Sequence, residues 1–388
     1  MKRQARLLIA TMLVAVPMLL AFRGRVDDDS RAKTFTVGKG GTLSVSVEGG
    51  DIRISVWDKN EVFVKVDGID DEDLDHLKMK QSGNDVRVEY RNRRSWSGWN
   101  SSHLRFEITV PSQYNADLHT SGGDITVRGT VNGKISGATS GGDVKLEDVK
   151  GGKVELSTSG GDMRTGDVQG DVILRTSGGN IEMGIVGGEA NVSTSGGNIV
   201  VKSVGKSLKA NTSGGDIEIG DVGGEASVST SGGDVRVRKV TGNATLKSSG
   251  GNIHLEGASG TVKANTSGGD ITLQNITGSI EAATAGGDVD AELRPTGKGR
   301  SKLSSAGGQI SLSIPEDARA TIEATIRVED HWGSRKSKYK VISDFKADTY
   351  EQDQDEREIR ATYKLNGGGD LIELKTVNSD ISIRKLRK

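Results

Sequence analysis

Acidic and amide side chains recur along the middle of the chain at a spacing that brings them together if the chain coils regularly. Each follows a hydroxyl or small residue and two glycines, and the gaps between them are 19 residues twice, then 18 residues seven times. Carboxylates stacked at the strand spacing of about 4.8 Å could hold calcium, which prefers oxygen ligands. The positions are Asp124, Asp143, Asp162, Asn180, Asn198, Asp216, Asp234, Asn252, Asp270 and Asp288.

The pattern favours a structural role for this series over a metal site. The calcium-binding β-roll uses a Gly-Gly-x-Gly-x-Asp nonapeptide, whereas this chain repeats Ser-Gly-Gly-Asp with an 18-residue period. Three of the ten positions are Asn, and an eleventh phrase closes on Gln309, so four rungs supply no charge. Asp and Asn stabilise turns by bonding the backbone two residues on. We therefore predict a turn-capping ladder, with amides relieving repulsion between carboxylates, and no metal or other cofactor.

Threonines form a second series with the same period. An exposed, flat threonine array on a β-solenoid could bind ice, but these residues are in phase with the apolar Ala226 and Val228. We therefore place them on the inward face of their strand, where we expect stacked hydroxyls to bond one another. They are Thr139, Thr158, Thr176, Thr194, Thr212, Thr230, Thr266 and Thr284.

One cluster outside the repeats has a composition suited to ligand binding. Three arginines and two of the four tryptophans fall within nine residues. At the tip of a long hairpin, these side chains could contact sugar rings or anionic envelope polymers by stacking and cation–π contacts. The alternative is that the indoles cover the end of the solenoid. The candidate binding residues are Arg91, Arg93, Arg94, Trp96 and Trp99.

Catalysis has little support in the sequence, and we predict no catalytic residues. The five histidines are scattered, the chain has no cysteine, and no Gly-x-Ser-x-Gly elbow is present. A β-helix polysaccharide enzyme, the alternative, needs clustered acidic and basic residues on one coil face. The outward positions of the first strand of each coil form instead a varied, solvated face. They are Thr126, Lys145, Arg164, Glu182, Val200, Glu218, Arg236, His254, Thr272 and Asp290.

The elements that position these residues are predicted to be short strands in a stack of coils. A strict period with no helix signal inside it indicates a solenoid. In the repeat that begins at Asp216, Ile217 and Ile219 alternate with a polar residue, which is the signature of a strand with one buried face. The predicted fold is all-β, a parallel β-helix of about 18-residue coils. Its apolar anchors do not recur every six residues, which favours a right-handed helix over the left-handed hexapeptide type.

The two ends are predicted to be less regular β sections that cap the solenoid. Residues 23–118 form the first section, residues 119–314 the regular repeats, and residues 315–388 the closing section. Gly49-Gly50-Asp51-Ile52 already uses the turn of the repeat, so we expect the first section to continue into the solenoid. Expected strands outside the repeats are residues 43–47, 52–56, 62–66, 86–90, 104–110, 320–328 and 358–364.

The first residues and the overall charge indicate an exported protein. Three basic residues precede an apolar run from Leu7 to Phe22, the shape of a secretory signal. Leu19-Leu20-Ala21 only half fits a cleavage site, so residues 1–22 are a signal peptide or an uncleaved anchor, the single expected contact with a membrane. A net charge of −1, with both signs mixed along the chain, excludes a basic stripe for nucleic acid.

These motifs together resemble the bacterial "putative adhesin" β-helix family, a domain of unknown function. The resemblance rests on the repeated Ser-Gly-Gly-Asp/Asn-Ile phrase, on Val110-Pro111 before the first full repeat, and on Val377-Asn-Ser-Asp380-Ile381. It implies a β-helix over nearly the whole chain and says little about a ligand. Where family members have Gly in the last motif, this chain has Ser379.

The sequence therefore predicts an exported, non-enzymatic β-helix, periplasmic or at the cell surface. Its expected role is that of an adhesin-like interaction module, with an envelope polysaccharide or a surface protein as partner. The alternatives are a polysaccharide-active enzyme and a structural or stress scaffold that binds a protein through its end loops.

Overall fold

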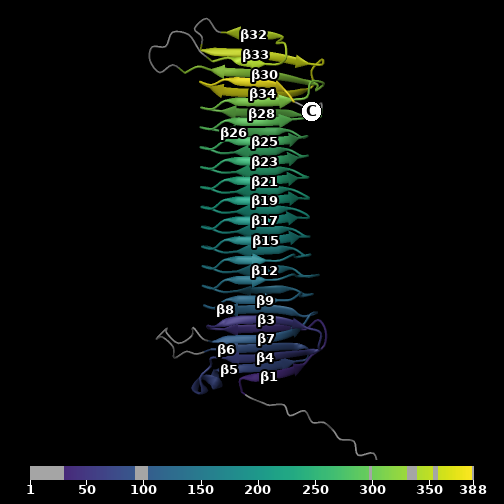
Figure 1. The fold of residues 1–388 in the computed structure, drawn as a ribbon, viewed down its shortest axis with the longest axis vertical. Helices are drawn as coiled ribbons and strands as arrows, with labels where there is room; N and C mark the ends of the chain where they lie inside the picture. The colour runs from purple at the N-terminus through teal and green to yellow at the C-terminus, as the bar shows by residue number, and fades with distance from the viewer. Residues whose placement is uncertain (1–29, 92–103, 297–298, 330–338, 353–356, 387–388) are drawn as a thin grey trace, which may run out of the picture.

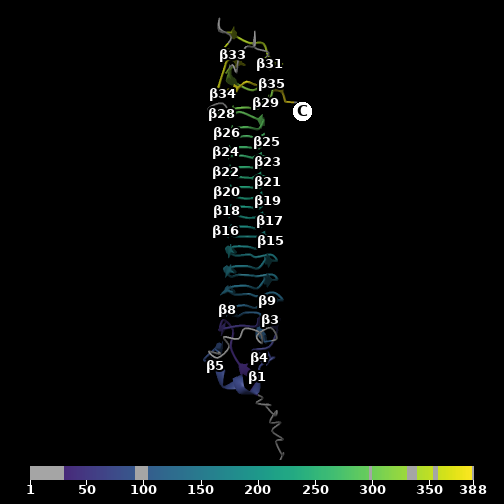
Figure 2. The ribbon, with the colours of Figure 1, turned by 90° about the vertical axis from the view of Figure 1, so that its left-hand side faces the viewer.

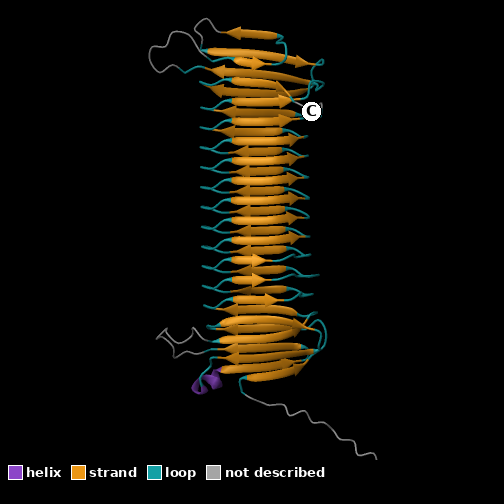
Figure 3. Cartoon of the chain, in the orientation of Figure 1, coloured by secondary structure: helices purple, strands orange, loops and turns teal. Residues whose placement is uncertain are grey.

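The computed structural model describes residues 30–91, 104–296, 299–329, 339–352 and 357–386, which form a long stack of short strands (Figure 1). The strands make two facing sheets that run the length of the stack (Figure 2). Strands and tight turns account for nearly all of it, and within the described ranges the only helix is the 3-10 turn η1 (Asp71–His76) (Figure 3). In that part of the chain, no helix has the length and apolar character needed to cross a membrane.

Sheet A contains one strand from each regular coil. In stacking order its strands are β1 (Ala32–Thr36), β4 (Glu61–Asp67), β7 (Arg105–Pro111), β3 (Asp51–Trp57), β9 (Ile125–Arg128), β11 (Val144–Leu146), β13 (Met163–Thr165), β15 (Ile181–Val186), β17 (Ile199–Val204), β19 (Ile217–Val222), β21 (Val235–Val240), β23 (Ile253–Ala258), β25 (Ile271–Ile276), β27 (Val289–Leu293), β29 (Ile310–Ile314), β35 (Ile381–Lys385) and β31 (Val341–Ser343).

Sheet B contains the other strand of each coil. In stacking order its strands are β5 (Leu77–Ser82), β6 (Asp85–Tyr90), β2 (Thr42–Val47), β8 (Asn115–Thr120), β10 (Ile135–Ala138), β12 (Val154–Ser157), β14 (Val172–Arg175), β16 (Ala190–Ser193), β18 (Leu208–Asn211), β20 (Ala226–Ser229), β22 (Ala244–Lys247), β24 (Val262–Asn265), β26 (Ile280–Thr284), β28 (Arg300–Ser305), β34 (Asp370–Val377), β30 (Ala320–Arg327), β33 (Glu358–Leu365) and β32 (Thr349–Gln352).

The core lies between the sheets and consists of columns of like residues. Ile199 pairs with Ile217, and Ile217 pairs with Val235, in parallel register. Each of these side chains is at most 1% exposed. Because side chains alternate across a strand, the residues between them face solvent. The expected all-β parallel β-helix is confirmed, while its handedness stays a prediction.

At each end of the stack, the coil that packs on the regular repeats is separated from them in the sequence by an intervening segment. β2 and β3 pair in parallel with β8 and β9, and β34 and β35 pair in the same way with β28 and β29. Antiparallel strands, such as the β5–β6 hairpin and the β30–β33 pair, lie beyond these coils. The turns at Asp51 and Asp380 therefore belong to the stack, as their sequence indicates.

An ion cluster holds the sheet B strands together near the C-terminal end. The Glu373 side chain, only 10% exposed, accepts from Lys375 Nζ at 2.6 Å and pairs with Arg300 on the adjacent strand β28. The hydrogen bonds from Lys375 and Arg300 lower the pKa of Glu373 to about 2. The carboxylate therefore stays ionised at neutral pH.

The turns that connect sheet B to sheet A require glycine at one of their two glycine positions. A Cβ on Gly161 would lie 2.1 Å from the carbonyl oxygen of Gly142 in the preceding coil, closer than two unbonded atoms can approach. A Cβ on Gly160 would lie 3.4 Å from the Gly141 oxygen, an ordinary contact. The second glycine of each pair thus allows the coils to stack closely.

This difference predicts that an alanine is tolerated at Gly160 and is destabilising at Gly161. Gly161→Ala should lower the free energy of unfolding by about 1–3 kcal/mol, because the new methyl group forces the coils apart. Gly160→Ala should change it by less than about 1 kcal/mol, since alanine also restricts the unfolded chain. Urea unfolding followed by circular dichroism measures both, and equal destabilisation would contradict the close-approach explanation.

Candidate functional site

The predicted Asp and Asn ladder links each coil to the next through hydrogen bonds. The Oδ1 atom of Asp216 accepts the backbone N–H of Asp234 at 2.8 Å, and Oδ1 of Asp234 accepts that of Asn252 at 2.8 Å. The same bond begins at Asp51, which accepts from Asp124, and ends at Asp288, which accepts from Gln309. The N–H group that donates thus belongs to the next coil, whereas the sequence suggested a donor in the residue's own turn. Intervening donors are the N–H groups of Asp143, Asp162, Asn180, Asn198, Asp216, Asp270 and Asp288.

These bonds give the ladder a structural role, with one side-chain oxygen of each rung bonded to the next coil. The amide Nδ2 of Asn180 also donates to Oδ1 of Asp162 at 3.2 Å, so here an amide offsets a neighbouring carboxylate as predicted. Within the described residues, no group of three or more His, Asp or Glu side chains is arranged to hold a metal ion.

The threonine series is buried, but the predicted hydroxyl-to-hydroxyl bonding is wrong. Thr230 Oγ1 donates to the carbonyl oxygen of Gly215 in the preceding coil at 2.9 Å and accepts the N–H of Gly233 at 3.3 Å. The backbone of the glycine turn lies nearer to each hydroxyl than the next threonine does. Ser248 makes the same two bonds in the next coil, to Gly233 and Gly251.

Removing one hydroxyl should therefore destabilise the stack, while shortening the side chain should not. Thr230→Val should lower the free energy of unfolding by about 1–2 kcal/mol, because two partly buried backbone groups lose their partner. Thr230→Ser should cost less than about 1 kcal/mol, because Ser248 already makes both bonds. The urea midpoints of the two variants measure this, and similar values would contradict the assigned role.

The predicted arginine–tryptophan cluster falls mostly outside the described residues. Arg91 is exposed just after β6, at the point where the chain leaves sheet B. Arg93, Arg94, Trp96 and Trp99 belong to residues 92–103, which the structure does not describe. Their role in ligand binding stays a prediction.

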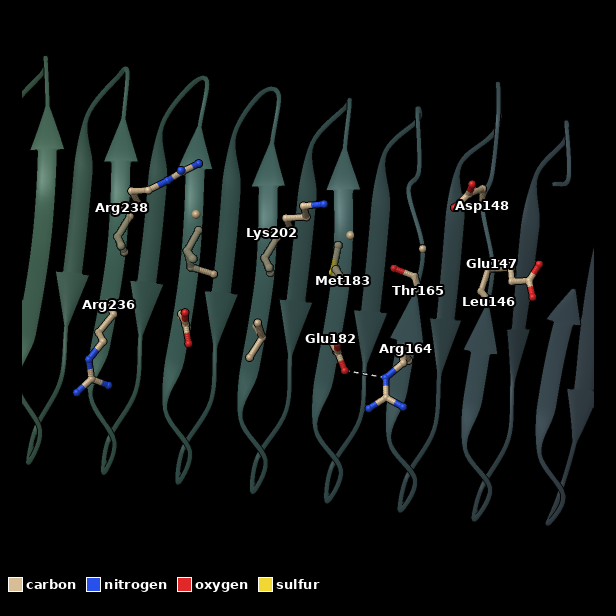
Figure 4. A pocket seen from close by; sticks show the side chains of 18 of the residues that line it. Leu146, Glu147, Asp148, Arg164, Thr165, Glu182, Met183, Lys202, Arg236 and Arg238 are labelled. Carbon is tan, nitrogen blue, oxygen red and sulfur yellow. Dashed lines mark hydrogen bonds and ion pairs between the residues drawn. The ribbon is translucent and has the colours of Figure 1, made fainter. Parts of the chain in front are cut away.

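A groove that the sequence did not predict runs along the outer face of sheet A from β11 to β23 (Figure 4). It encloses about 1050 Å³ and is open to solvent. Arg164, Glu182 and Arg236 lie in one row across the strands, and Lys202 and Arg238 lie in a second row. The groove therefore follows the long axis of the stack, perpendicular to its strands.

Glycines keep the second row partly empty. Gly166, Gly184 and Gly220 occupy, in their own coils, the repeat position that Lys202 and Arg238 fill in theirs. Without side chains at three of these five positions, the outer face is hollowed between its charged residues. Gly184 and Gly220 lie inside β15 and β19, and Gly166 directly follows β13; glycines at this position are the signal that sequence reasoning missed.

Most charges on the groove are already paired. Arg164 Nε donates to Glu182 Oε2 at 2.7 Å across β13 and β15, and this bond raises the pKa of the arginine. Arg236 pairs with Asp234 at 2.8 Å, and Arg238 with Asp221 at 2.6 Å. The groove therefore presents donors and acceptors of both charges on its outer face.

The centre of the groove differs from the rest. Lys202 on β17 and Glu218 on β19 have no ion pair or side-chain hydrogen bond to any described residue. Val200, which also lines the groove, is 41% exposed. It is one of the four large apolar side chains that are exposed in the described ranges. A free cation, a free carboxylate and an exposed apolar side chain thus lie on the adjacent strands β17 and β19.

A family model matches almost all of this architecture. The match covers residues 41–221, 166–272 and 206–384, which together span the stack and both of its ends. The chain belongs to the Toastrack DUF4097 family. No function is established for that family, and among curated proteins there is no match to this chain.

Solved structures similar to this Toastrack chain are distant in sequence. One from Parabacteroides merdae, described as a "putative adhesin", is 14% identical over 73% of this chain and 91% of its own, with a TM-score of 0.25. Another from Bacteroides fragilis, also a "putative adhesin", is 20% identical over 72% and 95%, with a TM-score of 0.20. A "putative lipid binding protein" from Parabacteroides distasonis is 18% identical over 73% and 92%, with a TM-score of 0.21. At these values the likenesses carry no argument about function.

Proposed function

We propose that this Toastrack protein is an exported, non-enzymatic interaction module of the cell envelope or surface, with an adhesin-like role. The observation that carries the proposal is the groove along sheet A, where ion pairs such as Arg164–Glu182 and Arg238–Asp221 join neighbouring coils. A surface of this kind suits a long partner lying along the stack. The basic start of the chain and the apolar run that follows support export.

The groove fits a binding surface better than an active site. A glycoside hydrolase needs two carboxyl groups about 5–5.5 Å apart for retention, or about 6.5–9.5 Å apart for inversion. Glu182 and Glu218 are separated by the coil of Val200, so their strands lie on the order of 10 Å apart, about twice the separation of a retaining pair. Glu182 is also engaged in the ion pair with Arg164, 2.7 Å from its Nε. The polysaccharide-active enzyme is therefore the weaker alternative.

Two places on the molecule support recognition. The first is the groove, and the second is the arginine–tryptophan segment around Trp96 and Trp99, whose cations suit anionic polymers. The other alternative is a scaffold that binds a protein partner through its ends. Such a scaffold requires neither the groove nor the arginine–tryptophan segment.

Binding of the purified protein to an array of envelope polysaccharides and surface proteins tests the proposal. We expect saturable binding with no shortening of the bound polymer. We expect Trp96→Ala/Trp99→Ala to weaken binding of anionic polymers by about tenfold, the equivalent of about 1.4 kcal/mol, with an unchanged circular dichroism spectrum. Release of shorter chains would identify an enzyme, and binding to proteins alone would favour the scaffold.

A further inference from the structure

We propose that the centre of the sheet A groove, around Lys202 and Glu218, binds an uncharged linear polysaccharide laid along the axis of the stack. This inference rests on the proposed function and names its ligand class and site. Three features of the groove lead to it: its charge balance, its lack of free backbone groups and its period.

The charge balance of the groove selects against charged polymers. Four arginine and lysine side chains and five carboxylates line it, so neither sign dominates. Polyanions bind where lysines and arginines outnumber carboxylates and release counterions. An uncharged chain meets no net repulsion here and can use donors and acceptors of both kinds. Charge-assisted hydrogen bonds from Lys202 and to Glu218 are stronger than those between neutral groups.

The sheet face favours a polyhydroxyl chain over an extended peptide. Peptides gain affinity by adding a strand to a sheet edge, where backbone groups are free. On the groove, the backbone of β17 is already paired with β15 on one side and β19 on the other. Affinity on this face must therefore come from side chains. Lysine supplies three donors and an ionised glutamate only acceptors, and sugar hydroxyls complement both.

The period of the groove matches a regular polymer. Successive coils bring equivalent positions, such as Glu182, Val200 and Glu218, back at each strand spacing of about 4.8 Å. One pyranose unit in an extended chain has a length of the same order, so successive sugars can lie over successive coils. The exposed Val200 then provides apolar contact for the C–H face of a sugar ring, while Lys202 and Glu218 bond its hydroxyls.

Calorimetric titration with neutral β-1,4-linked gluco- and chito-oligosaccharides of increasing length tests this site. We expect affinity to increase with length, because longer chains span more coils. Lys202→Ala/Glu218→Ala should weaken binding by about tenfold. The matched control is Lys209→Ala/Ser227→Ala, which alters exposed side chains of the same region on the outer face of sheet B. Circular dichroism and thermal unfolding confirm that each variant is folded.

The possible outcomes distinguish failure of the proposed binding site from failure of the proposed function. Equal affinity of the groove variant and the control variant would overturn the site. Binding of polygalacturonate but not of neutral chains would overturn the ligand class, as would binding of an extended peptide that Lys202→Ala/Glu218→Ala abolishes. If the array finds partners that neither variant affects, this inference fails and the proposed function stands. If no partner of any kind binds, both fail.

Discussion

The structure depends on the hydrogen bonds that join each turn to the turn of the next coil. At the same point in successive coils, a second glycine lets two backbones approach, a threonine or serine hydroxyl bonds across the gap, and an Asp or Asn oxygen accepts the next amide. No single coil can bury its apolar residues alone, so this junction sets the register in which the columns of Ile and Val form. The Ser-Gly-Gly-Asp phrase therefore specifies how the coils stack. This explains why it identifies the fold and gives no information about a ligand.

The local pattern was sufficient to predict most of the strands. Alternation at Ile217 and Ile219 predicts β19, and the runs 320–328 and 358–364 predict β30 and β33 within one residue at each end. The pattern did not show that β30 and β33 lie beyond β34, because pairing between distant segments depends on the three-dimensional stack. It also predicted the correct face for the threonine hydroxyls but the wrong hydrogen-bond acceptor. The acceptor is a glycine carbonyl of the preceding coil, and only the stacked structure shows that this carbonyl lies nearby.

The candidate site was harder to predict because part of the groove is formed by positions that have no side chain. Arg164, Glu182 and Arg236 stood out in the sequence only as a varied solvated row, and the ion pair between the first two requires adjacent coils in register. Gly184 and Gly220 read as ordinary members of a glycine-rich repeat, yet inside the strands they form the hollow. The repeat keeps the core constant while its outer positions vary, so recognition can differ among chains that share the fold.

Amide hydrogen exchange on the unmodified protein tests most directly whether the turns lock the coils together. The amides of Asp143, Asp234 and Asn252 lie in solvent-facing turns and donate to the coil before them. If the ladder holds the stack, they exchange as slowly as the amides of buried Ile217 and Val235, because both open only when coils separate. Exchange at the rate of an unstructured turn, beside a protected core, would show that the columns alone hold the stack and that the ladder is incidental.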